Sequence, residues 1–438
     1  MPTGPINRAK PQGLGLTAPT AVSKPAVTPS PAAPAKPFEG DPRAKKLIDP
    51  GELATAVPQR HVLDERGPSD AELTRAIAAS IGIRSHSAEL PTADEVRALE
   101  AQGKTVVFSQ AALDEAKRLP DLSAEFQQRE RIGGVTFSID SYETTDLDNA
   151  LSYRPGADGT HYVSVTGTDV SAWVRPGSVL DAGARRRAET RYLSSAGLVL
   201  PMLPLTLSEG KLSLFEGEPR LGKTVELHYG KGGELLGSRI YKSVVVNTHL
   251  SAGDAAEARE GRGRGATDPA LAQALTALGA LGARIQGSAS GAVSIEKLTP
   301  LFTTTAATEL GKALKAAGLE TSYRNQEPGK KSLYDEKPIG HVSIGAEAYA
   351  TFTGPMRRYA DLDVQRAIDR LLKGARPTGK LYEIDHRMRE VQHERMNGVV
   401  RDPRLRFDQE VIAATRKPAE QLGPPPAVPT APPLAPEE

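Results

Sequence analysis

Residues 135–170, VTFSIDSYETTDLDNALSYRPGADGTHYVSVTGTDV, contain the pattern that decides the fold. The segments VTFSI, LSYRP and HYVSVTGTDV alternate apolar and polar side chains, as strands with one buried face do. The stretch GADG between the last two is typical of a turn. Further along, TVELHYG and LLGSRIYKSVVVN flank the turn KGGE and predict a second hairpin. Hairpins join antiparallel strands, so the sequence predicts a mainly antiparallel sheet.

Segments with apolar residues at helical spacing follow these strands. One is SVLDAGARRRAETRYLSS, and after residue 267 the others are ALAQALTALGALGARI, TTTAATELGKALKAAG, DLDVQRAIDRLLKG and YEIDHRMREVQHERM. The fold class that we predict is therefore α+β, with a mainly antiparallel sheet surrounded by helices.

A small helical region is expected ahead of the sheet, at residues 38–105. Residues 69–72 (SDAE) and 92–95 (TADE) each have the form of a capping box, and apolar residues at helical spacing follow both. A third helix is expected to begin at Ser109. The region is either a helix-turn-helix-like nucleic-acid module or a structural adaptor, and the adaptor is favoured.

Both ends of the chain are rich in proline. Residues 1–37 and 417–438 contain almost no aromatic residues, so they cannot bury enough apolar surface to offset the entropy of ordering. We expect solvated, disordered tails. The alternative is that these tails act as Pro-rich ligands for protein partners.

The composition excludes several classes of protein. The chain has 438 residues, of which 39% are hydrophobic, and no cysteine, which excludes disulfides, thiolate metal sites and a Cys nucleophile. No apolar run is long enough to span a membrane, and MPTGPINRAK lacks a secretory apolar core. We expect a soluble, cytoplasmic monomer without a membrane partner. The net charge of +1 argues against a protein that coats nucleic acid electrostatically.

Hard oxygen ligands are concentrated immediately after the first predicted strand. Asp140, Asp146, Asp148 and Asn149 lie within ten residues. Asp146 and Asp148 are two residues apart, so in an extended turn they face the same side, and Asp140 can converge on them if the loop folds back. Such a cluster suits Mg²⁺ or Mn²⁺. The alternative is an acidic surface turn, which the spacing by itself does not exclude.

A second constellation is YATFTGPMRRYAD at residues 349–361. Pro355 suits the first turn of a helix, which would place Arg357 and Arg358 near a helix N-terminus that favours phosphate. Guanidinium groups there could hold phosphate oxygens and stabilise charge in a transition state. The alternative is a pair of surface arginines that bind Asp361 or another carboxylate.

Both segments resemble the two signature motifs of the RNB catalytic domain of the ribonuclease II and ribonuclease R family. The block between them, which includes LPMLP and LSLFEGE, resembles the family's central block, and FSQAALDEAKRLPD resembles the approach to the domain. The resemblance implies an RNB domain at residues 106–400 and a C-terminal extension at 401–438. The OB-fold domains that usually flank this domain are not recognisable.

The resemblance also implies roles for individual residues. Asp140, Asp146 and Asp148 resemble the family's metal-binding aspartates, and Asn149 stands at the fourth acidic position. Arg357 resembles the arginine that acts on the scissile phosphate. The residues that we expect to contact RNA are Tyr192, Tyr349, Thr353 and Arg358. Tyr192 resembles an aromatic that packs on the 3′-terminal nucleotides; its alternative is a core tyrosine on an amphipathic helix.

The expected function is that of a Mg²⁺-dependent, or Mn²⁺-dependent, hydrolytic exoribonuclease. It would degrade single-stranded RNA from the 3′ end to nucleoside 5′-monophosphates. Asn149 carries no charge, so weaker affinity for a second metal ion is expected. A catalytically weakened RNB-like protein that binds RNA or a protein partner is the alternative, and a metal-dependent phosphodiesterase with another substrate is a third, less favoured interpretation.

Overall fold

A computed structural model describes residues 68–102, 104–288 and 291–374 of the chain. The Pro-rich tails and the helix predicted in YEIDHRMREVQHERM lie outside these residues. The α-helices are α2 (Asp70–Ser80), α3 (Ala93–Ala101), α4 (Gln110–Lys117), α5 (Ser123–Gln128), α6 (Val170–Trp173), α7 (Val179–Arg187), α8 (Ala252–Arg259), α9 (Arg264–Thr267), α10 (Pro269–Ile285), α11 (Ile295–Ala316) and α12 (Tyr359–Leu372). Among these helices, none is long and apolar enough to cross a lipid bilayer.

The strands are β1 (Gly82–Ile83), β2 (Glu130–Arg131), β3 (Val135–Ile139), β4 (Asn149–Pro155), β5 (His161–Thr168), β6 (Arg191–Leu193), β7 (Leu198–Leu200), β8 (Pro219–Tyr229), β9 (Leu235–Val246), β10 (Thr248–Leu250), β11 (Tyr323–Asn325) and β12 (Leu333–Asp335). Short 3₁₀ turns, η2 (Ala157–Gly159) and η3 (Ser194–Ala196), and the π-helical turn η4 (Leu207–Lys211) complete the set.

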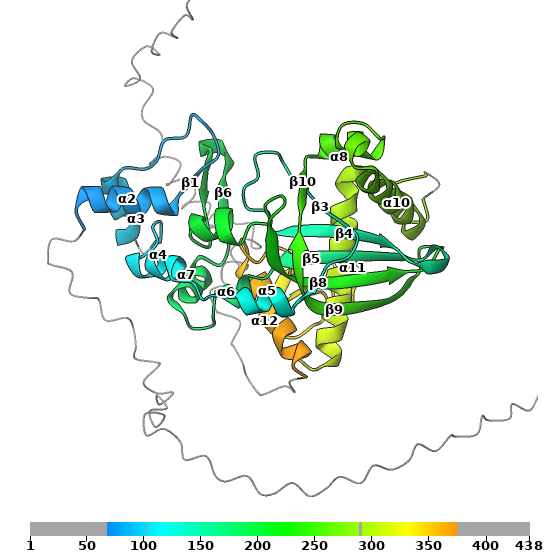
Figure 1. Cartoon of the computed structure of the whole chain (residues 1–438). Coiled ribbons are helices and arrows are strands. Elements are labelled where there is room, and N and C mark those ends of the chain that lie inside the picture. Colours follow the sequence, from blue (N-terminus) through cyan, green and yellow to red (C-terminus); the bar gives the residue numbers. More distant parts are fainter. Residues whose placement is uncertain (1–67, 103, 289–290, 375–438) are drawn as a thin grey trace, which may run out of the picture. The chain divides into compact units, whose positions relative to one another are not determined.

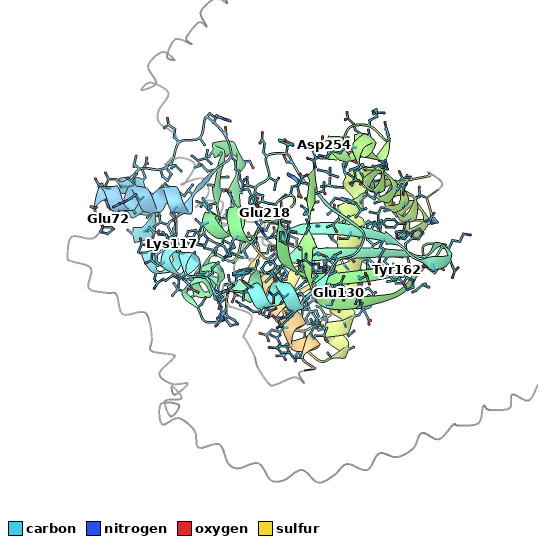
Figure 2. All side chains as sticks on the ribbon, viewed as in Figure 1. Glu72, Lys117, Glu130, Tyr162, Glu218 and Asp254 are labelled. Carbon is cyan, nitrogen blue, oxygen red and sulfur yellow. The ribbon has the colours of Figure 1, made fainter. Side chains whose placement is uncertain are left out.

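The main sheet has seven strands in the order β10-β3-β4-β5-β8-β9-β2 (Figure 1). All pairs from β3 to β9 are antiparallel, and only the two edge pairs, β10 with β3 and β2 with β9, are parallel. Tyr162, labelled in Figure 2, lies near the start of β5 beside the β4–β5 turn. The α+β class and the mainly antiparallel sheet are thus confirmed, and both predicted hairpins are present.

One face of the sheet is covered by helices. Alternate residues of β3, β4, β5 and β8, such as Phe137, Leu151, Val163 and Val225, share a core with α8, α10, α11 and α12. Burial of these side chains supplies most of the driving force for folding, at roughly 25 cal/mol per Å² of apolar surface. The helices therefore hold the sheet in place through this shared core. The ends of the strands lie outside the core and can carry polar side chains.

The N-terminal helices begin as the sequence predicts. Ser69 with Glu72 (labelled in Figure 2) and Thr92 with Glu95 form reciprocal capping boxes at α2 and α3, and Ser109 caps α4. Apolar residues of α2 and α3 share a core with β6 and β7. Strand β1 pairs with β7 and extends the β6–β7 hairpin to a three-stranded sheet. The helical region is therefore attached directly to this hairpin.

Two predicted helix boundaries were wrong. The helix expected through SVLDAGARRRAETRYLSS ends at Arg187, because Ala188 adopts a φ of 62° and the chain continues into β6. The helix expected to include Pro355 begins only at Tyr359. Both differences have one cause: the backbone of residues 188–190 pairs with that of residues 357–359, through Thr190 N–H to the Arg357 carbonyl (2.9 Å) and Tyr359 N–H to the Ala188 carbonyl (2.8 Å).

Candidate active site

The acidic segment connects two antiparallel neighbours, β3 and β4. Asp140 follows the last residue of β3, and its N–H donates to the carbonyl of Leu250 on β10 (3.0 Å). Asp148 and Asn149 stand where β4 begins. Because β3 and β4 are antiparallel, β3 finishes at the same end of the sheet where β4 starts, and the loop places these residues at that end. Burial raises the pKa of Asp140, and the negative charge of Asp146 adds to this, while His249 and Arg357 oppose it.

Asp148 is the buried centre of the site. It is only 4% exposed, accepts a hydrogen bond from the Met356 N–H (3.1 Å), and forms an ion pair with Nε of Arg357 (2.7 Å). Burial raises the pKa of Asp148 to about 7, although the Arg357 charge opposes this change. The structure thus brings together two residues that are 209 positions apart in the chain.

Asp146 accepts hydrogen bonds at both carboxylate oxygens. The Arg84 guanidinium donates to Oδ1 (3.2 Å) and the Tyr192 hydroxyl donates to Oδ2 (2.7 Å). Tyr192 lies on β6, and 47% of it is exposed, so it is not a core tyrosine on a helix. Burial, followed by the negative charge of Asp146, raises the pKa of Tyr192. The hydroxyl therefore remains a donor, and much of the ring is open to solvent.

The segment before α12, residues 354–358, forms a hydrogen-bonded turn that we call the arginine turn. Asp361, which is fully buried, accepts a hydrogen bond from the Gly354 N–H (2.8 Å), another from the Thr351 hydroxyl (2.8 Å) and two from Arg358 (3.0 and 2.7 Å). The Arg358 guanidinium is therefore bound by Asp361, which is the alternative to phosphate binding that the sequence left open for this arginine. Arg357 instead points its guanidinium at Asp148.

The remaining motif residues lie next to the arginine turn, on the side that faces the protein interior. Asn149 donates a hydrogen bond from Nδ2 to the Thr353 carbonyl (3.2 Å), which ties the start of β4 to the arginine turn. Gly167 on β5 permits this approach, since a Cβ there would lie 2.6 Å from the Phe352 carbonyl oxygen. Thr353 and Tyr349 are each only 8% exposed. Their side chains pack within the protein, and Tyr349 meets His341 edge to face.

Sequence reasoning missed two neighbours of this site, Arg84 and Tyr142. Arg84 comes from the N-terminal helical region, and it also binds Glu209 (2.9 Å) and the Thr145 hydroxyl (2.7 Å). Tyr142, inside the acidic segment, is 81% exposed, and its ring stacks 6.4 Å from that of His249 with an interplanar angle of 21°. The sequence could have indicated Tyr142, because it is an aromatic residue inside an acidic motif. Arg84 had no local signal, because its contacts depend on the pairing of β1 with β7.

The donor set fits a hard divalent cation in its chemistry. It consists of carboxylates, which are oxygen ligands, and burial raises the pKa values of Asp140 and Asp148. Within residues 68–102, 104–288 and 291–374, however, no three carboxylate or imidazole side chains are arranged to hold a metal ion together. Instead, Arg84 and Tyr192 bind Asp146, and Arg357 binds Asp148.

A carboxylate and a guanidinium from two distant segments thus meet where β4 begins, a pairing whose groups can bind a cation and a phosphate respectively. A family model described as the RNB domain matches residues 129–327 and 320–374, which together make up more than half of the chain. The chain therefore belongs to the RNB domain family.

Curated relatives are named as ribonucleases. Ribonuclease R 1 of Lactococcus lactis is 25% identical over 65% of this chain and 45% of its own length. Ribonuclease R of Thermotoga maritima is 33% identical over 32% of this chain and 20% of its own length. The chain thus spans less than half the length of these relatives.

A solved structure supports the fold. Mycoplasma genitalium RNase R in complex with ribose methylated single-stranded RNA has a TM-score of 0.59 and 15% identity, and the match covers 74% of this chain and 62% of that one. At this identity the likeness concerns the fold alone.

Proposed function

We propose that this chain is a metal-dependent hydrolytic exoribonuclease that shortens single-stranded RNA from its 3′ end and releases nucleoside 5′-monophosphates. One observation carries the proposal: Arg357 is held 2.7 Å from the buried Asp148, so a guanidinium and a carboxylate of the two family motifs meet at one point. The direction of degradation is carried over from the family resemblance.

Asp140, Asp146 and Asp148, with the amide oxygen of Asn149, would hold Mg²⁺, or Mn²⁺ in its place. When bound, the metal supplies an activated water and neutralises charge at the scissile phosphodiester. Arg357 then has the phosphate as its partner and stabilises the negative charge that develops on its oxygens. No covalent nucleophile from the protein is required.

Other residues orient the substrate or the catalytic groups. The exposed ring of Tyr192 offers a stacking surface for a base, and stacking tolerates any sequence. Arg358 acts through Asp361 to hold the arginine turn, and Tyr349 and Thr353 support that turn from the protein interior. We assign these three residues to organisation of the RNA-binding surface. The Pro-rich tails remain candidates for binding protein partners.

The deciding experiment uses a 5′-labelled single-stranded RNA and its DNA counterpart, with Mg²⁺, Mn²⁺ or EDTA. Metal-dependent shortening of the RNA from the 3′ end, with mononucleotide release, is expected for the wild type and not for Arg357→Ala. Arg262→Ala is a matched control, because Arg262 pairs with Glu260 and lies outside the candidate site. Shortening that survives in Arg357→Ala would contradict the assignment of this residue.

A catalytically weakened RNA-binding protein is the second candidate. Asn149 favours it, because its amide donates to the Thr353 carbonyl and adds no negative charge to the metal site. The same assay separates the two: binding of the RNA without shortening in either metal would favour the second candidate.

A further inference from the structure

The N-terminal helical region contributes a charged side chain to the candidate site. Arg84 directly follows β1, and its N–H donates to the Gly197 carbonyl (2.7 Å), which continues the pairing of β1 with β7. This pairing fixes the backbone beside the hairpin that carries Tyr192. The Arg84 side chain is only 24% exposed. The pairing of β1 with β7 therefore determines where Arg84 lies.

The guanidinium of Arg84 joins two carboxylates from different parts of the chain. Its Nη2 contacts Oδ1 of Asp146 (3.2 Å) and Oε1 of Glu209 (2.9 Å), and its Nη1 donates to the Thr145 hydroxyl (2.7 Å). The exposed fractions of the Asp146 and Glu209 side chains are 11% and 26%. Two carboxylates in partial burial repel one another, and a shared cation relieves that repulsion.

We propose that Arg84 lowers the affinity of the candidate metal site for its ion, because its guanidinium binds Asp146 and Glu209 and competes with a divalent cation for their oxygens. This inference rests on the proposed function, because it takes Asp146 as a metal ligand. It gives the N-terminal helical region a role beyond that of an adaptor: the region sets the affinity of the site for its metal.

The test measures binding of Mn²⁺ to the full chain without RNA, from the electron paramagnetic resonance signal of the free ion. Arg84→Gln removes the charge but keeps hydrogen-bonding groups, and should lower the Kd for Mn²⁺ by roughly five- to tenfold. Arg84→Lys keeps the charge and should stay within about twofold of the wild type. Asp146→Asn should weaken binding, which would locate the measured ion at this site.

Arg97→Gln is the matched control. Arg97 lies in the same helical region, pairs with Asp70 and Asp94, and its loss changes the net charge of the chain by the same amount. Its Kd should remain within about twofold of the wild type. Thermal unfolding would confirm that each variant is folded.

The outcomes separate this inference from the function on which it rests. Tighter binding in Arg84→Gln, with unchanged binding in Arg84→Lys and Arg97→Gln, supports it. Unchanged or weaker binding in Arg84→Gln, while Asp146→Asn still loses the ion, overturns it and leaves the proposed function intact. Absence of Mn²⁺ binding in wild type and Arg84→Gln alike would overturn both the inference and the metal site.

Discussion

The two halves of the candidate site, the acidic segment and the arginine turn, are built differently. The arginine turn is fixed by Asp361, which accepts four hydrogen bonds from residues 351–358 and is fully buried. The acidic segment between Asp140 and Asp146 has no regular secondary structure, and Tyr142 within it is 81% exposed. Residues from elsewhere bind two of the aspartates: Arg84 and Tyr192 bind Asp146, and Arg357 binds Asp148.

This difference indicates which half is preorganised. The positive half is arranged largely by the hydrogen bonds that Asp361 accepts from residues 351–358. In the negative half, burial raises the pKa values of Asp140 and Asp148, so the charged form of these carboxylates is disfavoured. We therefore expect substitutions in the acidic segment to affect metal binding and turnover, and substitutions in the arginine turn to affect stability as well.

The largest expected effect is that of Asp148→Asn on turnover. The proposed mechanism requires this carboxylate, so the rate of RNA shortening should fall by roughly 10³-fold or more, while RNA affinity changes little. Gel-based kinetics and a filter-binding assay would measure the two quantities. Asp158→Asn, in the exposed β4–β5 turn, is the matched control. A variant that retains wild-type turnover would show that Asp148 does not belong to the reaction.

The next largest effect separates the two halves by stability. Asp361→Asn leaves Arg358 without its partner and weakens the arginine turn, at a cost of roughly 2–4 kcal/mol in the free energy of unfolding. Asp140→Asn should cost less than about 0.5 kcal/mol or stabilise the protein, because burial already disfavours its charge. Denaturant unfolding would compare both variants with the wild type. Equal losses of unfolding free energy in the two variants would show that the arginine turn contributes no more to stability than the acidic segment does.

The sequence predicts those parts of the site that depend on neighbouring residues, and fails where the contacts join segments far apart in the chain. The hairpins β4–β5 and β8–β9 follow from alternation and turn residues, both of which are local. The end of α7 at Arg187 could not be predicted, because the backbone of residues 188–190 leaves the helix to pair with a segment about 170 positions away. The Arg84 contact has the same origin. The motif residues were identified from their types, but their partners depend on tertiary structure.

A third prediction concerns the pH dependence of stability. Burial raises the pKa of Asp148 to about 7 in the folded chain, whereas in the unfolded chain this carboxyl has the ordinary aspartate pKa of 3.8. Between these values the folded state binds more protons, so this group's contribution to stability falls as pH rises, by at most roughly 1.4 kcal/mol per pH unit. Asp148→Asn should remove this slope. Unfolding curves between pH 4 and 8 would detect it, and identical slopes in both proteins would refute the raised pKa.

The smallest expected effect is that of Asn149→Asp, which restores a carboxylate at the fourth position of the acidic motif. The added negative charge should lower the Mg²⁺ concentration needed for half-maximal RNA shortening by about two- to fivefold. The gain is limited because the Asn149 amide now donates to the Thr353 carbonyl, and an aspartate would lose this hydrogen bond and face that oxygen. Gln286→Glu, at the exposed C-terminal end of α10, would be the matched control, since it adds the same charge outside the candidate site. An unchanged Mg²⁺ requirement in Asn149→Asp would mean that position 149 acts through the Thr353 hydrogen bond, as part of the arginine turn, and not as a metal ligand.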